Sequence, residues 1–144
     1  MAHIYTVEFR ILSEHINPET ITEALRLRPS QVRANGTTRS DGKRLTGMWA
    51  FDGGEQGGPS IKWKLLEEGL ESVIGKLWPV KNQINSYSRE AKLIWWCGHF
   101  QSSFDGGPEL SSGLLTRLAQ FDASLYIDSY FSGDDPPPNP KSAA

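Results

Sequence analysis

Hydrophobic and polar residues alternate along the first patterned segment of the chain, which has the sequence YTVEFRIL at residues 5–12. A period of two is typical of a strand that is buried on one face only. The buried face is expected to consist of Tyr5, Val7, Phe9 and Ile11. The same alternation places Glu8 and Arg10 on the opposite face, where we expect both to be exposed.

A helix start follows in the sequence INPETI at residues 16–21. Asn17 suits the N-cap position, and Pro18 suits the first helical position, where its missing N–H costs no hydrogen bond. Apolar residues then recur at helical spacing, and Pro29 is expected to end the helix near Leu27.

Residues 28–46 form a polar and basic segment. One strand is predicted within it, at residues 31–34, and a second at residues 45–51, which begins at the end of the segment. One Asn-Gly pair and one Asp-Gly pair lie between these strands, and both pairs are turn signals. The two strands are therefore predicted to form a long hairpin. The segment holds five basic residues and one acidic residue, so its net charge is +4.

The second predicted helix covers residues 61–78, where apolar residues recur at helical spacing. A glycine-rich loop precedes it, and Ser60 is placed at the N-cap. Gly69 and Gly75 weaken the helix by about 1 kcal/mol each relative to alanine, but they would allow close packing against a sheet. The residues that follow, 80–90, are predicted to be a polar connector.

The last third of the chain repeats the order of strand, helix and strand. Residues 92–100 predict a strand that is apolar on both faces, as in the centre of a sheet. A third helix is expected after Gly107 and Pro108, and residues 124–131 predict the last strand. The buried stripe of this helix is expected to be Leu110, Leu114, Leu115, Leu118 and Phe121.

These elements together predict an α+β fold, a two-layer sandwich with three helices on one face of a four- or five-stranded, mainly antiparallel sheet. If residues 31–34 form a strand, residues 5–100 follow the ferredoxin-like order βαββαβ, extended by one helix and one strand. We expect a single domain over residues 1–132. The proline-rich residues 133–144 are predicted to be a disordered tail.

Composition narrows the classes of function. The chain has 144 residues and a net charge of −2, which makes nucleic acid an unlikely partner. Its single cysteine, Cys97, cannot form a disulfide within the chain, which is typical of a reducing compartment. The first residues show no signal peptide, and no apolar run approaches the roughly 20 residues of a membrane helix. We therefore expect a cytoplasmic protein with no membrane partner.

Four sequence motifs connect the chain with a known family. They are FRI near the start, INPETITEALRLRPS, the Gly-x-Trp of GMW, and the final LLTRLAQFDASLYIDSYF. With these motifs, residues 5–131 resemble the bacterial family of domains of unknown function DUF4279. The resemblance implies one small domain, and it transfers no catalytic residue, cofactor or substrate.

The first candidate site is the face of the sheet that the helices leave open. Alternation along the last strand places Tyr126, Asp128 and Tyr130 on that face, together with Glu8 and Arg10 of the first strand. Aromatic and charged side chains in this arrangement suit a partner protein or a ligand. An ordinary solvated sheet face or a homodimer interface is the competing interpretation.

The second candidate site is an anion-binding site made by Arg33, Arg39, Arg44 and the helix start at Ser60. Backbone N–H groups at a helix N-terminus can bind an anion, and nearby arginines would help. The glycines match neither a Walker motif nor a dinucleotide-binding fingerprint. A flexible charged loop is the simpler interpretation of this segment.

The third candidate is a reactive group of Cys97, His99 and Asp105, in which the first two share one face of a strand. The aromatic residues around Cys97 favour a buried and inert thiol instead. One cysteine and three scattered histidines hardly provide the four ligands of a structural zinc site. We therefore expect no catalytic residue, metal or cofactor.

The sequence thus favours a non-enzymatic bacterial interaction module, of the immunity or accessory kind, that binds a partner protein through its open sheet face. The immunity or accessory label rests on size, solubility and setting alone. The alternative is a protein that binds a small ligand or anion through the basic segment, with an enzyme included among the possibilities.

Overall fold

A single five-stranded sheet organises the structure, a computed structural model that describes residues 3–54 and 61–131. Its strands lie in the order β2-β3-β1-β4-β5. Their bounds are β1 His3–Ser13, β2 Gln31–Arg33, β3 Gly47–Phe51, β4 Lys92–Gln101 and β5 Ser124–Phe131. Neighbouring strands are antiparallel except for β4 and β5, which run parallel. The sheet is therefore mainly antiparallel, as predicted.

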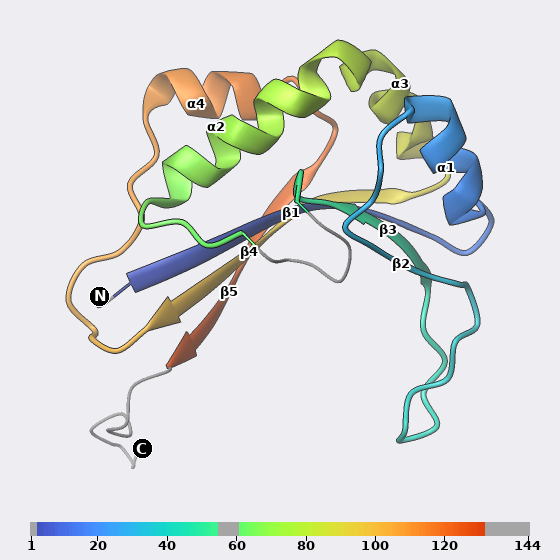
Figure 1. Ribbon diagram of the computed structural model, residues 1–144, viewed down its shortest axis with the longest axis horizontal. Coiled ribbons are helices and arrows are strands. Elements are labelled where there is room, and N and C mark those ends of the chain that lie inside the picture. Colours follow the sequence, from blue (N-terminus) through green and yellow to red (C-terminus); the bar gives the residue numbers. More distant parts are fainter. Residues whose placement is uncertain (1–2, 55–60, 132–144) are drawn as a thin grey trace.

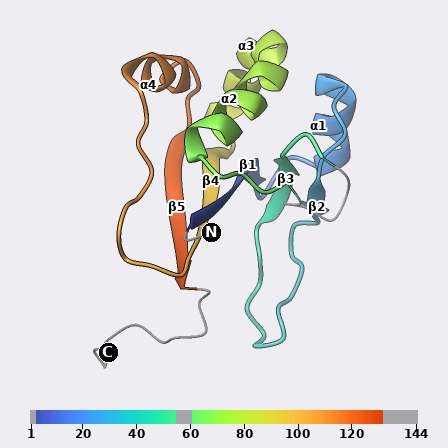
Figure 2. The ribbon, with the colours of Figure 1, turned by 60° about the vertical axis from the view of Figure 1, so that its left-hand side comes forward.

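The helices cover one face of this sheet and leave the other uncovered (Figure 1). They are α1 Pro18–Leu25, α2 Leu66–Leu77, α3 Lys81–Asn85 and α4 Ser112–Leu118, with short 3-10 turns η1 Trp78–Val80 and η2 Ser86–Arg89. Figure 2 shows the same two layers from the side, with the helices above the strands. The predicted α+β sandwich is confirmed, and its relation to the ferredoxin-like order remains a prediction.

The pairing of β1 decides which side chains meet on each face. Phe9 lies opposite Trp95 on β4 and opposite Phe51 on β3, so these aromatic residues share the helix-covered face. The next residue, Arg10, lies opposite Ile94 and Ala50 on the open face. Because side chains alternate along a strand, odd-numbered residues of β1 enter the core and even-numbered residues do not.

The core lies between the sheet and the helices. Phe9, Trp49 and Trp95 are at most 1% exposed, and the rings of Phe9 and Trp95 meet edge to face at 4.8 Å. Burial of side chains of this size contributes about 1.5–3 kcal/mol each to stability. Tyr5 and Ile11 are also buried, which confirms the apolar face predicted for the first strand.

The first helix begins where its sequence predicts. The Asn17 side chain accepts a hydrogen bond from the Glu19 backbone N–H at 2.9 Å, and Pro18 is the first helical residue. Its end is two residues earlier than expected, since Arg26 adopts a left-handed conformation with φ 56° after Leu25. The left-handed residue stops the helix before the proline can do so.

The second helix starts later than predicted. Residues 61–65 lie outside the helix, and Trp63 exchanges two backbone hydrogen bonds of 2.8 Å with Tyr5. They cover the edge of β1 that β3 leaves free, because β3 pairs with β1 only at residues 9–13. Ser60 is therefore not the N-cap of α2: Leu65 occupies that position, and Ser60 lies outside the described residues.

The helical regions that follow α2 differ from the prediction. Residues 80–90 are not a plain connector, because α3 and η2 fold there and Ile84 is completely buried. The helix expected after Pro108 begins at Ser112, with the Ser111 hydroxyl accepting from the Leu114 N–H. Leu115 is 50% exposed, so it does not belong to the buried stripe of that helix.

Within residues 3–54 and 61–131, none of the helices has the length and apolar character needed to cross a membrane. The tail predicted for residues 133–144 lies outside the described residues.

The two glycines of α2 have different surroundings, which yields a first prediction. A Cβ at Gly69 would lie 2.8 Å from atoms of both Trp63 and Val7, whereas a Cβ at Gly75 meets nothing within 4 Å. Gly69→Ala should therefore lower the free energy of unfolding by about 1–3 kcal/mol through overpacking. Gly75→Ala, the matched control, should raise it by about 0.5–1 kcal/mol. Urea unfolding measures both, and equal effects would contradict the close packing at Gly69.

Candidate functional site

The open face of the sheet carries four aromatic side chains from β4 and β5, namely Trp96, Phe100, Tyr126 and Tyr130. The rings of Phe100 and Tyr130 stack at 5.0 Å with an interplanar angle of 13°. Tyr126 lies opposite Trp96 and is 49% exposed, and Tyr130 is 41% exposed. The structure thus places the predicted tyrosines of β5 on the uncovered side of the sheet.

Arg10 connects this aromatic group to the centre of the sheet. Its guanidinium lies 4.3 Å from the centroid of the Trp96 ring, a cation–π contact. Its Nε also donates to the Glu8 carboxylate at 2.8 Å. Arg10 is therefore held between an aromatic face and a carboxylate, and about a fifth of its side chain (21%) is exposed.

Glu8 lies on the open face but is not exposed, which corrects the expectation from strand alternation. It is completely buried, and its carboxylate accepts hydrogen bonds from Arg10, the Ser30 hydroxyl at 3.0 Å and the Gln31 amide at 2.9 and 3.0 Å. Gln31 reaches it from β2 across Ala50 of β3, whose small side chain leaves room. Glu8 is thus a positioning residue for Arg10 and is closed to an incoming partner.

Asp128 and Tyr130 interact with each other on the last strand. The Tyr130 hydroxyl donates to the Asp128 carboxylate, and this hydrogen bond raises the pKa of Tyr130, with smaller contributions from burial and from the negative charge. Tyr126 makes no hydrogen bond within the described residues. Its exposed phenol is therefore the free hydrogen-bonding group at this end of the open face.

The basic segment 28–46 forms an ordered hairpin that extends away from the helices (Figure 1). Its three predicted anion-binding arginines have separate settings. Arg33 donates to the Thr46 carbonyl at 2.9 Å, Arg39 pairs with Asp41, and the Arg44 guanidinium lies beside Gly36. Burial, and to a lesser extent the charge of Arg10, lowers the pKa of Arg33.

The sequence also suggested a reactive group of Cys97, His99 and Asp105. Cys97 is completely buried in the core, and burial raises the pKa of its thiol to about 12. A thiol with this pKa is protonated at neutral pH and is a poor nucleophile. The alternative interpretation of a buried thiol therefore describes Cys97 better.

His99 instead belongs to a chain of hydrogen bonds that no sequence pattern indicates. His3 Nε2 lies 2.5 Å from the backbone oxygen of Asp105, and His3 Nδ1 lies 2.8 Å from His99 Nε2. A carbonyl can only accept, so His3 donates from Nε2, and in the contact between the two rings one nitrogen donates and the other accepts. The chain joins β1, β4 and the loop after β4, and no sequence pattern signals a pair 96 residues apart.

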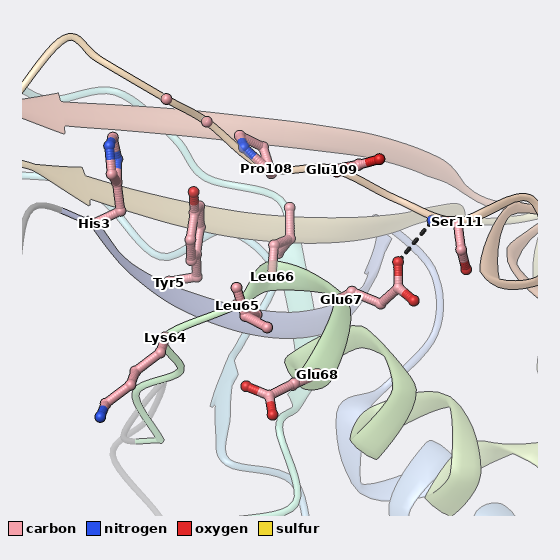
Figure 3. A pocket seen from close by; sticks show the side chains of 12 residues that line it. His3, Tyr5, Lys64, Leu65, Leu66, Glu67, Glu68, Pro108, Glu109 and Ser111 are labelled. Carbon is pink, nitrogen blue, oxygen red and sulfur yellow. Dashed lines mark hydrogen bonds between the residues drawn. The ribbon is translucent and has the colours of Figure 1, made fainter.

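Beside His3 lies a hollow of about 650 Å³. Its floor and rim come from the start of β1, the start of α2 and the loop after β4, as Figure 3 shows. The side chains that define it best are Tyr5, Lys64, Leu66, Glu67, Pro108 and Glu109. It is on the helix-covered side of the sheet, so it is separate from the open face.

Comparison with known proteins gives one match. The family model described as Domain of unknown function (DUF4279) matches residues 3–132 of the chain. Neither the curated proteins nor the solved structures include a significant match. The matched range runs from the first residue of β1 to one residue beyond β5, so it includes the whole sheet.

The buried carboxylate gives a second prediction. Glu8→Gln keeps the size of the side chain but removes its charge and turns an NH2 group toward donors. We expect the free energy of unfolding to fall by about 2–4 kcal/mol, because the buried donors of Arg10, Ser30 and Gln31 lose the carboxylate that accepts their hydrogen bonds. Urea unfolding measures the loss. Glu90→Gln, at an exposed position, is the control, and a loss below about 0.5 kcal/mol for Glu8→Gln would contradict the buried network.

A third prediction concerns pH. Burial first, and the charge of His3 second, lower the pKa of His99 below its usual value of 6.5. The unfolded chain therefore binds the proton more tightly, and stability falls as the pH drops from about 6.5 toward the lowered pKa. The slope for one proton is at most about 1.4 kcal/mol per pH unit. Unfolding free energies at pH 7.5, 6.5 and 5.5 should decline less steeply for His99→Gln than for the unchanged protein, and equal slopes would contradict this assignment.

Proposed function

The chain belongs to the DUF4279 family, and from its own surfaces we propose that it is a non-enzymatic interaction module that binds a partner protein through the open face of its sheet. The single observation that supports this proposal most is the uncovered aromatic group of β4 and β5. Exposed apolar patches rimmed by polar residues are characteristic of protein interaction sites.

The arrangement of this face supports binding to a preformed surface. Trp96 is fixed by Arg10, Arg10 is fixed by the buried Glu8, and Phe100 is stacked on Tyr130. Side chains that are already ordered lose little conformational entropy when a partner binds. Tyrosine, tryptophan and arginine are also the residues that most often dominate the energy of protein interfaces.

Charge supports one class of partner over others. The basic segment 28–46 carries a net charge of +4, while the whole chain carries −2. Part of that charge, at Arg33, lies in the sheet itself, and the hairpin continues beyond the sheet on the side away from the helices (Figure 2). A partner protein that presents acidic residues next to apolar ones would match both the hairpin and the aromatic group.

Anion binding by the basic segment is a second proposal with less support. Arg33, Arg39 and Arg44 each have their own intramolecular contact, and α2 begins at Leu66 rather than after Ser60. A site in which arginines converge on one anion would need these contacts to be exchanged. The open face requires no such rearrangement.

A fourth prediction tests the open face directly. Tyr126 is replaced by a photoreactive phenylalanine analogue in the full chain, which is expressed in its native cells. On irradiation, this variant should crosslink to one acidic partner protein in good yield. The matched control is the same probe at Leu115, which is 50% exposed on α4 and should not capture that protein. Adding Lys43→Glu should reduce capture at Tyr126 by roughly three- to tenfold through charge repulsion. Arg89→Glu, at an exposed site in η2, should not.

The purified partner then provides the quantitative test. Tyr126→Ser combined with Asp128→Asn should abolish binding in calorimetry while the melting temperature changes little, because both side chains lie outside the core. Capture of a second copy of the chain at Tyr126 would replace the proposal with a homodimer. Equal capture at Tyr126 and Leu115, or binding that survives the double substitution, would contradict the role of the open face.

A further inference from the structure

The hollow beside His3 has walls that are fixed by hydrogen bonds. The loop that closes it is bound at one end by the contact of His3 Nε2 with the Asp105 carbonyl, at 2.5 Å. At its other end the Ser111 N–H donates to the Glu67 carboxylate at 2.6 Å, the dashed line in Figure 3. Because the loop is held at both ends against β1 and α2, the hollow belongs to the folded structure and needs no ligand to form.

A tyrosine side chain with a free hydroxyl lies at the floor of this hollow. Tyr5 is 3% exposed, its ring stacks on that of His99 at 4.6 Å, and its hydroxyl makes no hydrogen bond within the described residues. In Figure 3 the hydroxyl of Tyr5 points between His3 and Leu66 toward the side of Pro108. The hydroxyl is therefore available inside the hollow, and a ligand that makes a hydrogen bond to it would gain affinity.

Charge around the hollow indicates the class of ligand. Three carboxylates, those of Glu67, Glu68 and Glu109, line it together with one ammonium group, that of Lys64. His3 offers no further ring nitrogen, since both are used within the protein. The lining therefore has an excess of negative charge, which favours a cation.

The remaining surface is apolar and suits the body of a small molecule. Leu66 is 1% exposed at the floor, and Leu65 and Pro108 are exposed at the rim. A hollow of about 650 Å³ lies within the range of small-molecule sites in proteins, and an apolar lining with a few polar groups is usual for them.

We propose that this hollow binds a small organic amine, with its apolar body on Leu66 and its ammonium group between the Tyr5 hydroxyl and the rim carboxylates. The phenol oxygen accepts a hydrogen bond from the ammonium, and Glu109 supplies an opposite charge that has no other partner within the described residues. The site is independent of the open sheet face, since it lies on the opposite side of the sheet.

A fifth prediction tests this site with benzylamine as the probe. We expect a dissociation constant of about 0.1–10 mM, as is reasonable for a molecule of so few atoms. In NMR spectra, the chemical shifts of the backbone amides of Leu66, Glu67, Gly107 and Glu109 should change when benzylamine is added. The neutral isostere benzyl alcohol and the anion benzoate should bind at least about tenfold more weakly, because the lining is acidic.

Two variants make the test specific. Tyr5→Phe removes only the hydroxyl and keeps the ring on His99, and it should weaken benzylamine binding by roughly three- to tenfold. Glu109→Gln should weaken it as well, while Glu90→Gln, an exposed carboxylate outside the hollow, should not. The proposal would be overturned if benzylamine did not bind at 10 mM, or if the amide chemical-shift changes mapped outside the hollow. It would also be overturned if benzoate bound as tightly as benzylamine, or if Tyr5→Phe left the dissociation constant of benzylamine unchanged. Capture at Tyr126 should be unaffected by these variants.

Discussion

The hydrogen bonding of β1 along both of its edges is the constraint on which the rest of the structure depends. One edge is paired with β4 over almost its whole length, and the other is shared between β3 and the single residue Trp63. Every buried backbone group on a central strand needs such a partner, because an unpaired one costs free energy. This pairing explains why Trp63 is held against β1 and why α2 begins only at Leu66. The late start of α2 in turn leaves the hollow between that helix and the loop after β4.

A second constraint is the buried charge of Glu8. A carboxylate taken out of water is tolerated only when it is paired and fully hydrogen-bonded, and here three residues from two parts of the chain meet that requirement. The consequence extends to the surface, because the same carboxylate orients Arg10 over Trp96. The aromatic open face is thus coupled to a polar network in the middle of the sheet.

The two candidate sites use opposite sides of one sheet and different chemistry. The open face is aromatic with basic residues beside it, whereas the hollow is apolar at its floor and acidic at its rim. The hairpin that carries the basic charge extends away from the helices (Figure 1), whereas the hollow is lined by residues at the start of α2 and lies on the side of the helices. A partner protein on one side and a small amine on the other would therefore not compete for the same residues. Their separation also means that failure of either proposal leaves the other standing.

The sequence by itself determined the five strands and the start of α1, because the strand period and the Asn17-Pro18 start are encoded by residues within a few positions of one another. It also determined which residues of β5 face away from the core, since alternation holds along a whole strand. Only the tertiary structure decided that Glu8 is buried, because its partner Gln31 arrives from β2 across β3 and its partner Ser30 directly precedes β2. The same is true of the hollow: the His3 contact with Asp105 joins residues 102 positions apart, and such contacts leave no periodic trace in a single sequence.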